Sequence, residues 1–169
     1  GLINTLGPIG GAIFGFFYAP IVITGMHHSF TAVETQLLAD IATTGGSFIF
    51  PVAAMSNVAQ GAAALSVLLV LTKDNKMKGI ASASGISALL GITEPAIFGV
   101  NLKLRYPFYG AMIGTAVSSA YIMLTKVLAL APGAAGLPGI ISIRPDSMIN
   151  YIIGMAISMA VAVASTIIL

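Results

Sequence analysis

Long apolar runs dominate this sequence and restrict it to one class of fold. Four runs approach or exceed the roughly 20 residues that a helix needs to cross a bilayer: 6–26, 55–72, 106–131 and 148–169. Only 7% of the residues are charged and 57% are hydrophobic, whereas a soluble domain has about 25% charged residues. The sequence therefore predicts an all-α membrane protein without enough polar surface for a separate soluble domain.

Two further segments are interrupted by glycine and are too short or too polar to span. Breaks at 43–47 and 91–95 predict two re-entrant helical hairpins, over about 31–55 and 79–101, because membrane proteins tolerate non-helical backbone only where protein or a hydrated cavity surrounds it. The basic clusters at 73–78 and 103–105 flank the second hairpin and predict that both of its ends are cytoplasmic. Turn residues around a β-branched run predict a short β-hairpin within 136–146.

The most informative residue is Glu94, a carboxylate inside an apolar run. A charge at membrane depth is costly unless it meets a partner or a water-filled cavity, so it indicates a functional site. A structural interpretation also exists, because Thr93 and Glu94 precede Pro95 and an acidic side chain stabilises a helix N-terminus. The functional interpretation is that Glu94 accepts hydrogen bonds from ligand hydroxyls and acts as general base for one of them.

A histidine pair, His27 and His28, ends the first apolar run. A histidine in an apolar chain is more often a packed side chain than a ligand group, but two in a row beside Ser29 favour function. Metal binding is the weaker hypothesis, because there is no cysteine and the acidic residues are scattered. We predict no metal and no cofactor. The basic clusters are too short for a nucleic-acid partner, and the absence of a Walker-type phosphate loop argues against an ATPase.

Five other polar side chains lie among apolar neighbours. They either line a site for a polyhydroxy ligand or satisfy broken backbone, and the sequence leaves both interpretations open: Glu34, Gln36, Asp40, Asn57 and Gln60. Three classes of protein remain compatible with the sequence. These are a permease for a polyhydroxy ligand, an ion-coupled secondary transporter with Glu94 as the proton or cation site, and a non-transporting membrane bundle, which would need no intramembrane carboxylate.

Two motifs resemble a known family. The run Gly91-Ile92-Thr93-Glu94-Pro95, preceded in the chain by Gly25-Met26-His27-His28-Ser29-Phe30, is similar to the sugar-translocating enzyme IIC domain of the bacterial phosphoenolpyruvate-dependent phosphotransferase system. The runs at 56–61 and 99–105 are similar to the sucrose branch of its glucose superfamily, with the trehalose and β-glucoside branches close by. The resemblance covers nearly the whole chain, 1–169.

This resemblance implies roles for particular residues. Glu94 and one histidine of the pair, His27 or His28, would bind the sugar near the hydroxyl that becomes phosphorylated, and these three are our candidate catalytic residues. Candidate sugar-binding residues also include Thr93, Gly45, Gly46 and Asn57. The phosphoryl donor would be a cysteine of a separate enzyme IIB domain, in agreement with the absence of cysteine here.

The resemblance also implies an assembly and a location. We expect the chain to be the C-terminal, transport part of an enzyme IIC domain in the bacterial cytoplasmic membrane, importing and phosphorylating a disaccharide, most plausibly sucrose. A homodimer would form through an N-terminal part that this chain lacks. Both ends of the chain lie in or near apolar sequence, which suggests a piece of a longer membrane protein.

Overall fold

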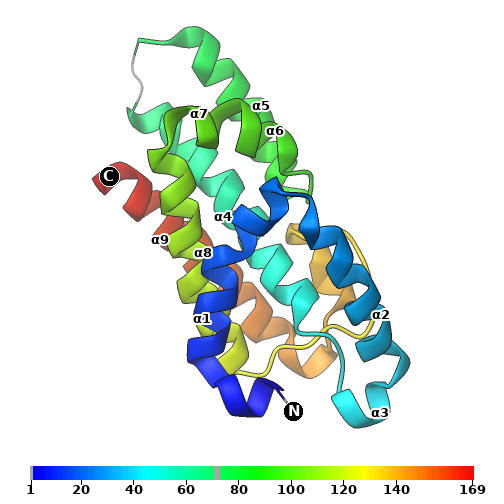
Figure 1. Ribbon diagram of the computed structural model, residues 1–169. Coiled ribbons are helices and arrows are strands. Elements are labelled where there is room, and N and C mark those ends of the chain that lie inside the picture. The colour runs from blue at the N-terminus through cyan, green and yellow to red at the C-terminus, as the bar shows by residue number, and fades with distance from the viewer. Residues whose placement is uncertain (1, 71–72) are drawn as a thin grey trace.

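The computed structural model describes residues 2–70 and 73–169, and all its regular elements are helical (Figure 1). In chain order they are α1 (Leu2–Ile23), η1 (Met26–Ser29), α2 (Phe30–Ala39), α3 (Ile41–Thr44), α4 (Ile49–Val70), α5 (Asn75–Leu89), α6 (Glu94–Ala96), η2 (Ile97–Asn101), α7 (Leu102–Leu104), α8 (Tyr106–Leu124), η3 (Leu137–Ser142), η4 (Pro145–Ser147) and α9 (Met148–Ile168). The expected all-α class is therefore confirmed for the described residues.

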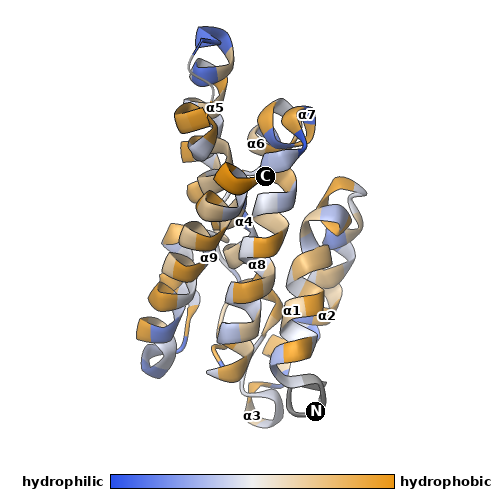
Figure 2. Cartoon of the chain, turned by 90° about the vertical axis from the view of Figure 1, so that its left-hand side faces the viewer, coloured by the Kyte–Doolittle hydropathy of each residue, from blue (hydrophilic) through white to orange (hydrophobic). Residues whose placement is uncertain are grey.

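The long helices form the membrane-spanning part of the molecule. In residues 2–70 and 73–169, three segments are long and apolar enough to cross a bilayer, namely α4, α8 and Pro145–Ile168. A fourth is added if the first helix and Met26–Ala39, which are bent by 115° at the break between them, count as one span. Figure 2 shows hydrophilic residues gathered at the start of α5 and at the start of α9, with apolar helix between these two ends.

Small residues let the central helices approach closely. Helix α8 packs against α9, α1 and α4. A Cβ atom on Gly114 of α8 would lie 2.7 Å from the carbonyl oxygen of Ser158 in α9, and one on Gly11 of α1 would lie 2.6 Å from that of Ser119 in α8. Such backbone proximity is typical of helix pairs in membranes, where packing replaces the hydrophobic effect.

Residues 75–104 run toward the middle of the molecule and back to the same end. Helix α5 descends along α4, the chain reverses at 90–93, and α6, η2 and α7 return beside α5 (Figure 1). The basic clusters at 73–78 and 103–105 consequently lie toward the same end. Glu94 lies just after the turn, and the re-entrant character of the hairpin expected over about 79–101 stays a prediction.

The returning arm contains a π-helical turn, η2, that is fixed by a buried amide pair. Asn101 Nδ2 donates hydrogen bonds of 2.6 Å to Gln60 Oε1 and 3.0 Å to the Gln60 carbonyl oxygen in α4. Both residues are fully buried. Gln60 thus accepts both hydrogen bonds of the Asn101 amide, while Gln60 Nε2 and Asn101 Oδ1 stay buried without a partner among the described residues.

A long connection between α8 and α9 enters from the other end of the molecule. It runs up from the end of α8, reaches the tip of the α5–α6 turn, and returns through η3 and η4 to the start of α9 (Figure 1). Helix α8 ends at Leu124, earlier than the run 106–131 suggested, because Lys126 adopts a left-handed φ of 52° and Val127 N–H bonds back to the Ile122 carbonyl. That pattern is a Schellman C-cap.

The predicted β-hairpin within 136–146 is not found. No strand occurs in the part of the chain that the structure describes, and 137–142 form a 3-10 helix that begins with Leu137-Pro138. Extended pairing is limited to isolated antiparallel bridges of Ala129 with Ser47 and with Ile143. Ile143, at the end of the β-branched run, pairs with Ala129, while Pro138 starts a 3-10 helix, where its missing N–H breaks no hydrogen bond.

The first expected hairpin, about 31–55, corresponds to α2, α3, a short loop and the start of α4. Helix α2 runs downward from the middle of the molecule, and α4 runs upward from the loop at 45–48 (Figure 1). Helix α4 starts at Ile49, earlier than the Met55 that the sequence suggested. Pro51 lies in its first turn, where a missing N–H breaks no helical hydrogen bond.

Candidate functional site

The break before Glu94 is shaped by close backbone contact. Gly91 has a φ of +108°, which side-chain-bearing residues rarely adopt, and a Cβ atom there would lie 2.8 Å from the Ala135 carbonyl oxygen. Ile92 N–H donates a 3.0 Å hydrogen bond to the Ser87 carbonyl. Glycine is therefore required at this position by both conformation and space.

After this turn, Glu94 begins the short helix α6, and Pro95 follows in its first turn. Thr93 is buried, with 5% exposure, whereas Glu94 is exposed. No hydrogen bond or ion pair joins the Glu94 carboxylate to another described residue. The carboxylate thus lies at a helix start without a protein partner, an arrangement compatible with both the capping and the binding interpretation.

His27 lies near Glu94, in the turn η1 between α1 and α2. The Glu94 carboxylate interacts electrostatically with the His27 imidazole. No hydrogen bond or ion pair joins the two side chains in the described residues, so the relation between them is electrostatic only. His27 is half-buried and its buried Nδ1 has no partner among the residues described.

His28 has a different environment from His27. Its ring centroid lies 4.0 Å from that of His27, but the residue is exposed. Of the two histidines, His27 is the more buried. The pair therefore contributes one imidazole with an unused nitrogen to the same region as an unpaired carboxylate.

Gly45 and Gly46 lie elsewhere. Figure 1 places α3 and the following loop at the far end of α2 from η1. Both glycines have positive φ angles, of 76° and 129°, and a Cβ atom on Gly46 would collide with the Ala129 carbonyl oxygen. The structure brings these two residues to the Ala129 bridge and not to Glu94.

Asn57 contacts protein rather than open space. Its Nδ2 donates a 2.6 Å hydrogen bond to the carbonyl oxygen of Ala135, the same carbonyl that faces Gly91. The Tyr151 hydroxyl donates a 2.9 Å hydrogen bond to the next carbonyl, that of Gly136. Asn57 is thereby connected to the Glu94 turn through the α8–α9 connection.

This contribution of residues 132–136 was not predicted from the sequence. A Cβ atom on Gly136 would lie 2.6 Å from the Leu89 carbonyl oxygen, so the connection packs backbone to backbone against the end of α5. The closely spaced glycines 133, 136 and 139 are the signal that marks such an approach, but they also fit an ordinary surface loop.

A cavity of about 330 Å³ opens beside α2. It is lined by Thr31, Glu34, Thr35, Leu38, Ala39 and Pro132. Ser47 Oγ donates a 2.8 Å hydrogen bond to Glu34 Oε1. Of the other polar residues considered, Gln36 and Asp40 are exposed, and Asp40 accepts a hydrogen bond from the Thr43 hydroxyl.

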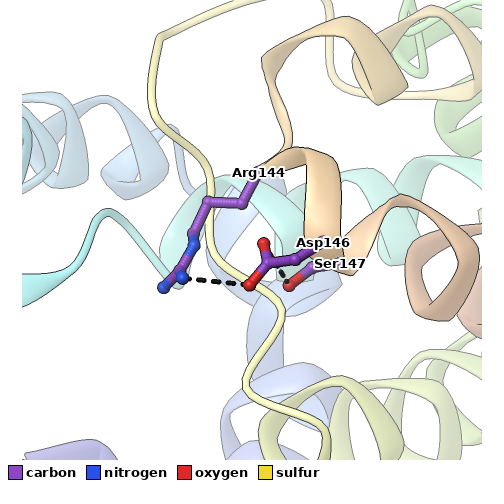
Figure 3. A network of polar contacts seen from close by, with 3 residues as sticks. All are labelled: Arg144, Asp146 and Ser147. Atoms are coloured by element: carbon purple, nitrogen blue, oxygen red, sulfur yellow. Dashed lines mark hydrogen bonds and ion pairs between the residues drawn. The ribbon is translucent and has the colours of Figure 1, made fainter.

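A cluster of charged and polar side chains lies just before the start of α9. Arg144 forms an ion pair of 3.0 Å with Asp146, which also accepts a 3.4 Å hydrogen bond from the Ser147 hydroxyl (Figure 3). Arg144 N–H bonds to the Leu128 carbonyl. These contacts hold the return of the connection into α9 and involve none of the candidate site residues.

The chemistry available at Glu94 and His27 is acceptance and donation of hydrogen bonds. A free carboxylate and an imidazole nitrogen can bind ligand hydroxyls, and the carboxylate makes the stronger, charge-assisted bonds. Within residues 2–70 and 73–169 no three His, Asp or Glu side chains gather closely enough to hold a metal ion. The arrangement is suited to a neutral polyhydroxy ligand.

Comparisons with known proteins agree closely on the family. The phosphotransferase system EIIC family model matches residues 1–115. The chain is 67% identical over 168 residues to a sucrose-specific EIIBC component of Vibrio alginolyticus, covering 99% of this chain and 35% of that protein. It is 66% identical to the sucrose-specific EIIBC component of Pasteurella multocida, with the same coverage.

A relative of lower identity is named for a different sugar, trehalose. The trehalose-specific EIIBC component of Bacillus subtilis is 48% identical over 169 residues, covering 98% of this chain and 35% of that protein. The chain spans about a third of the length of these curated relatives. No solved structure matches it significantly. From the family model and these identities, the chain belongs to the EIIC family of the phosphotransferase system.

Proposed function

We propose that this chain is the sugar-binding and translocating part of a phosphotransferase-system permease that imports sucrose. Sucrose is favoured over trehalose because the relatives at 66–67% identity are named sucrose-specific, whereas the trehalose-specific relative is 48% identical. The observation that carries the site assignment is the proximity of an unpaired carboxylate, Glu94, to a half-buried imidazole, His27, in a chain of apolar helices.

In this proposal Glu94 and His27 hold the glucosyl unit of the disaccharide. Glu94 accepts hydrogen bonds from sugar hydroxyls, and its charge makes these bonds stronger than those between neutral groups. His27 donates or accepts through the nitrogen that protein leaves unused. Thr93, buried beside Glu94, and His28, adjacent to His27, complete the sugar-contacting set.

The proposed reaction is phosphoryl transfer to the bound sugar. The donor is a phosphocysteine on an enzyme IIB domain: the sulfur–phosphorus bond breaks, a bond forms from phosphorus to the sugar hydroxyl oxygen, and the hydroxyl proton passes to Glu94 as general base. The thiolate leaves with its electron pair. This chain contributes positioning of the hydroxyl, which alone supplies a large share of such rate enhancements.

The remaining predicted residues keep supporting roles in the proposal. Asn57 acts through Ala135, whose carbonyl faces the Gly91 turn, and it reaches the sugar only if that bond exchanges. Gly45 and Gly46 offer backbone groups at the other end of α2. Both hairpins are proposed to be re-entrant, and the protein is proposed to be a homodimer in the bacterial cytoplasmic membrane, with 73–78 and 103–105 facing the cytoplasm.

The test uses the full-length permease with Glu94→Gln and His27→Ala. Glu94→Gln keeps the size and the acceptor oxygen but removes the charge, and we expect sucrose binding and phosphoenolpyruvate-dependent sucrose phosphorylation to fall at least tenfold. His27→Ala is expected to reduce both more strongly than His28→Ala does. Normal uptake and phosphorylation in Glu94→Gln would overturn the site assignment.

The same assay separates the permease from the ion-coupled transporter. Sugar phosphate that appears only when phosphoenolpyruvate is supplied supports the phosphotransferase reaction. Accumulation of unmodified sucrose that an uncoupler abolishes would instead identify Glu94 as a proton or cation site. Competition by trehalose and by β-glucosides in the same assay determines which sugar the site prefers.

A further inference from the structure

The cavity beside α2 lies on a helical face that leads away from His27. Thr31, Glu34, Thr35 and Leu38 are spaced i, i+3, i+4 and i+7, so they share one face of α2, and all four line the cavity. Residues Met26–Ala39 run on as a helix from the bend after the first helix. His27 lies in the 3-10 turn η1, four residues before Thr31, so the first turn of this face follows η1 directly.

A second chain path joins the same cavity to Glu94. Pro132 forms one wall, and Ala135, three residues later, places its carbonyl against Gly91. Gly91 itself precedes Glu94 by three residues. The cavity is therefore linked to the Glu94 turn by the α8–α9 connection on one side and to His27 by α2 on the other.

The lining suits a sugar ring. Glu34 is half-buried, and its Oε1 is held by the Ser47 hydroxyl at 2.8 Å, while Oε2 has no hydrogen-bond partner in the described part of the chain. The Thr31 hydroxyl is likewise without one, whereas that of Thr35 bonds the Thr31 carbonyl. Leu38, Ala39 and Pro132 supply apolar surface, and small-ligand sites combine a largely apolar wall with few oriented polar groups.

We propose that this cavity binds the second hexose unit of the disaccharide, the one that is not phosphorylated, with Glu34 as its main hydrogen-bond acceptor and Thr31 as an additional contact. The proposal rests on the proposed function, in which Glu94 and His27 hold the first unit. Glu34 is then a specificity-determining residue. It distinguishes a disaccharide from the glucosyl unit alone.

The experiment measures affinity of the purified full-length permease in lipid nanodiscs for two probes, sucrose and methyl α-D-glucopyranoside, by calorimetry and by competition. Glu34→Gln keeps an oxygen that the Ser47 hydroxyl can bond and removes the charge. We expect it to weaken sucrose binding about tenfold, as loss of one charge-assisted hydrogen bond does, and to leave methyl α-D-glucopyranoside binding unchanged.

A second variant guards against misfolding. Thr31→Val is isosteric and breaks no side-chain hydrogen bond, and we expect it to weaken sucrose binding about threefold, again without effect on the monosaccharide. Val33→Ala, on the exposed face of α2 outside the cavity, is the matched control and should bind both sugars normally. Ser47→Ala removes the hydrogen bond that fixes Glu34 and tests whether this bond affects the affinity for sucrose but not that for the monosaccharide.

Several results would overturn the proposal. Unchanged sucrose affinity in both Glu34→Gln and Thr31→Val would do so, and so would an equal loss for both sugars, which indicates general damage to the site. Methyl α-D-glucopyranoside that fails to compete with sucrose at hundredfold excess would contradict the division into two subsites. Failure of the proposed function is distinguishable, because Glu94→Gln would then retain sucrose affinity whatever the Glu34 variants do.

Discussion

The side-chain amide of Asn57 in α4 donates a 2.6 Å hydrogen bond to the carbonyl oxygen of Ala135, 78 residues further along the chain. The same carbonyl lies where a side chain on Gly91 would have to go. Three separate parts of the chain, α4, the α8–α9 connection and the turn before Glu94, therefore meet at one peptide group. Their mutual position depends on this contact.

Removal of the Asn57 amide is expected to destabilise the protein. In Asn57→Ala the Ala135 carbonyl loses its side-chain donor, and leaving such a group unpaired costs about 1–3 kcal/mol. Thermal and denaturant unfolding of the full-length permease in detergent measure this loss. Asn75→Ala, an exposed amide at the start of α5, is the control and should change stability by no more than about 0.5 kcal/mol. Equal unfolding midpoints for the two variants would contradict the prediction.

Gly91→Ala should impair both stability and transport. The substitution introduces a methyl group 2.8 Å from the Ala135 carbonyl oxygen at a φ of +108°, so the turn must shift and Glu94 shifts with it. We expect a loss above about 1 kcal/mol and strongly reduced sucrose phosphorylation. Gly79→Ala is the matched control, since a Cβ atom there meets nothing within 4 Å. It lies inside α5 and should stabilise the protein by about 0.5–1 kcal/mol; a similar loss in both variants would refute the steric argument.

The buried pair Gln60 and Asn101 is expected to show strong coupling. Gln60→Leu removes the bond to Gln60 Oε1 and leaves Asn101 Nδ2 only the Gln60 carbonyl oxygen. Asn101→Leu leaves Gln60 Oε1 buried without a donor, which costs about 1–3 kcal/mol. The double variant removes both polar groups, so its loss should be smaller than the sum of the single losses. A double-mutant cycle on the unfolding free energy gives the coupling. Additive single effects would show that the pair does not act as a unit.

Lys126→Gly should stabilise the end of α8 without affecting transport. Lys126 is exposed and has a φ of 52°, a conformation that costs a side-chain-bearing residue about 1 kcal/mol and glycine little. We expect a gain of about 0.5–1 kcal/mol, measured by thermal unfolding. Unchanged sucrose uptake checks that the cap is remote from the site, and a lower unfolding midpoint would show that the lysine side chain matters more than its backbone.

The sequence predicted the structure correctly where the length of an apolar run and the helix-breaking residues Gly and Pro determine it. The start of α8 at Tyr106, that of α9 at Met148 and the break at 91–95 follow from apolar length and from Gly and Pro. The end of α8 did not follow, because its left-handed cap is occupied by Lys126, which carries no signal for that conformation. The β-branched run near Ile143 suggested local pairing, but its partner Ala129 lies outside the predicted segment.

The candidate site was predictable in its polar residues and not in its surroundings. A carboxylate in an apolar run and a histidine pair are recognisable as candidate site residues from the sequence. Only the tertiary structure shows that His27 is half-buried and His28 is exposed. Residues 132–136 have no charged or polar side chain, so the chemistry of their side chains gives no sign that they contribute to the site. Their contribution comes from backbone carbonyls, which every residue type possesses.

The contact between the turn at Gly91 and the α8–α9 connection at Gly136 affects how permeable the bundle is to water and solutes. Two segments reach inward from opposite ends of the bundle and touch through main-chain atoms, at distances that exclude even one added carbon. Such a contact leaves no passage for water or solute between the two tips. We expect this contact to close the path between the two tips. Because it is formed by main-chain atoms, the closure should tolerate most side-chain substitutions other than those of its glycines.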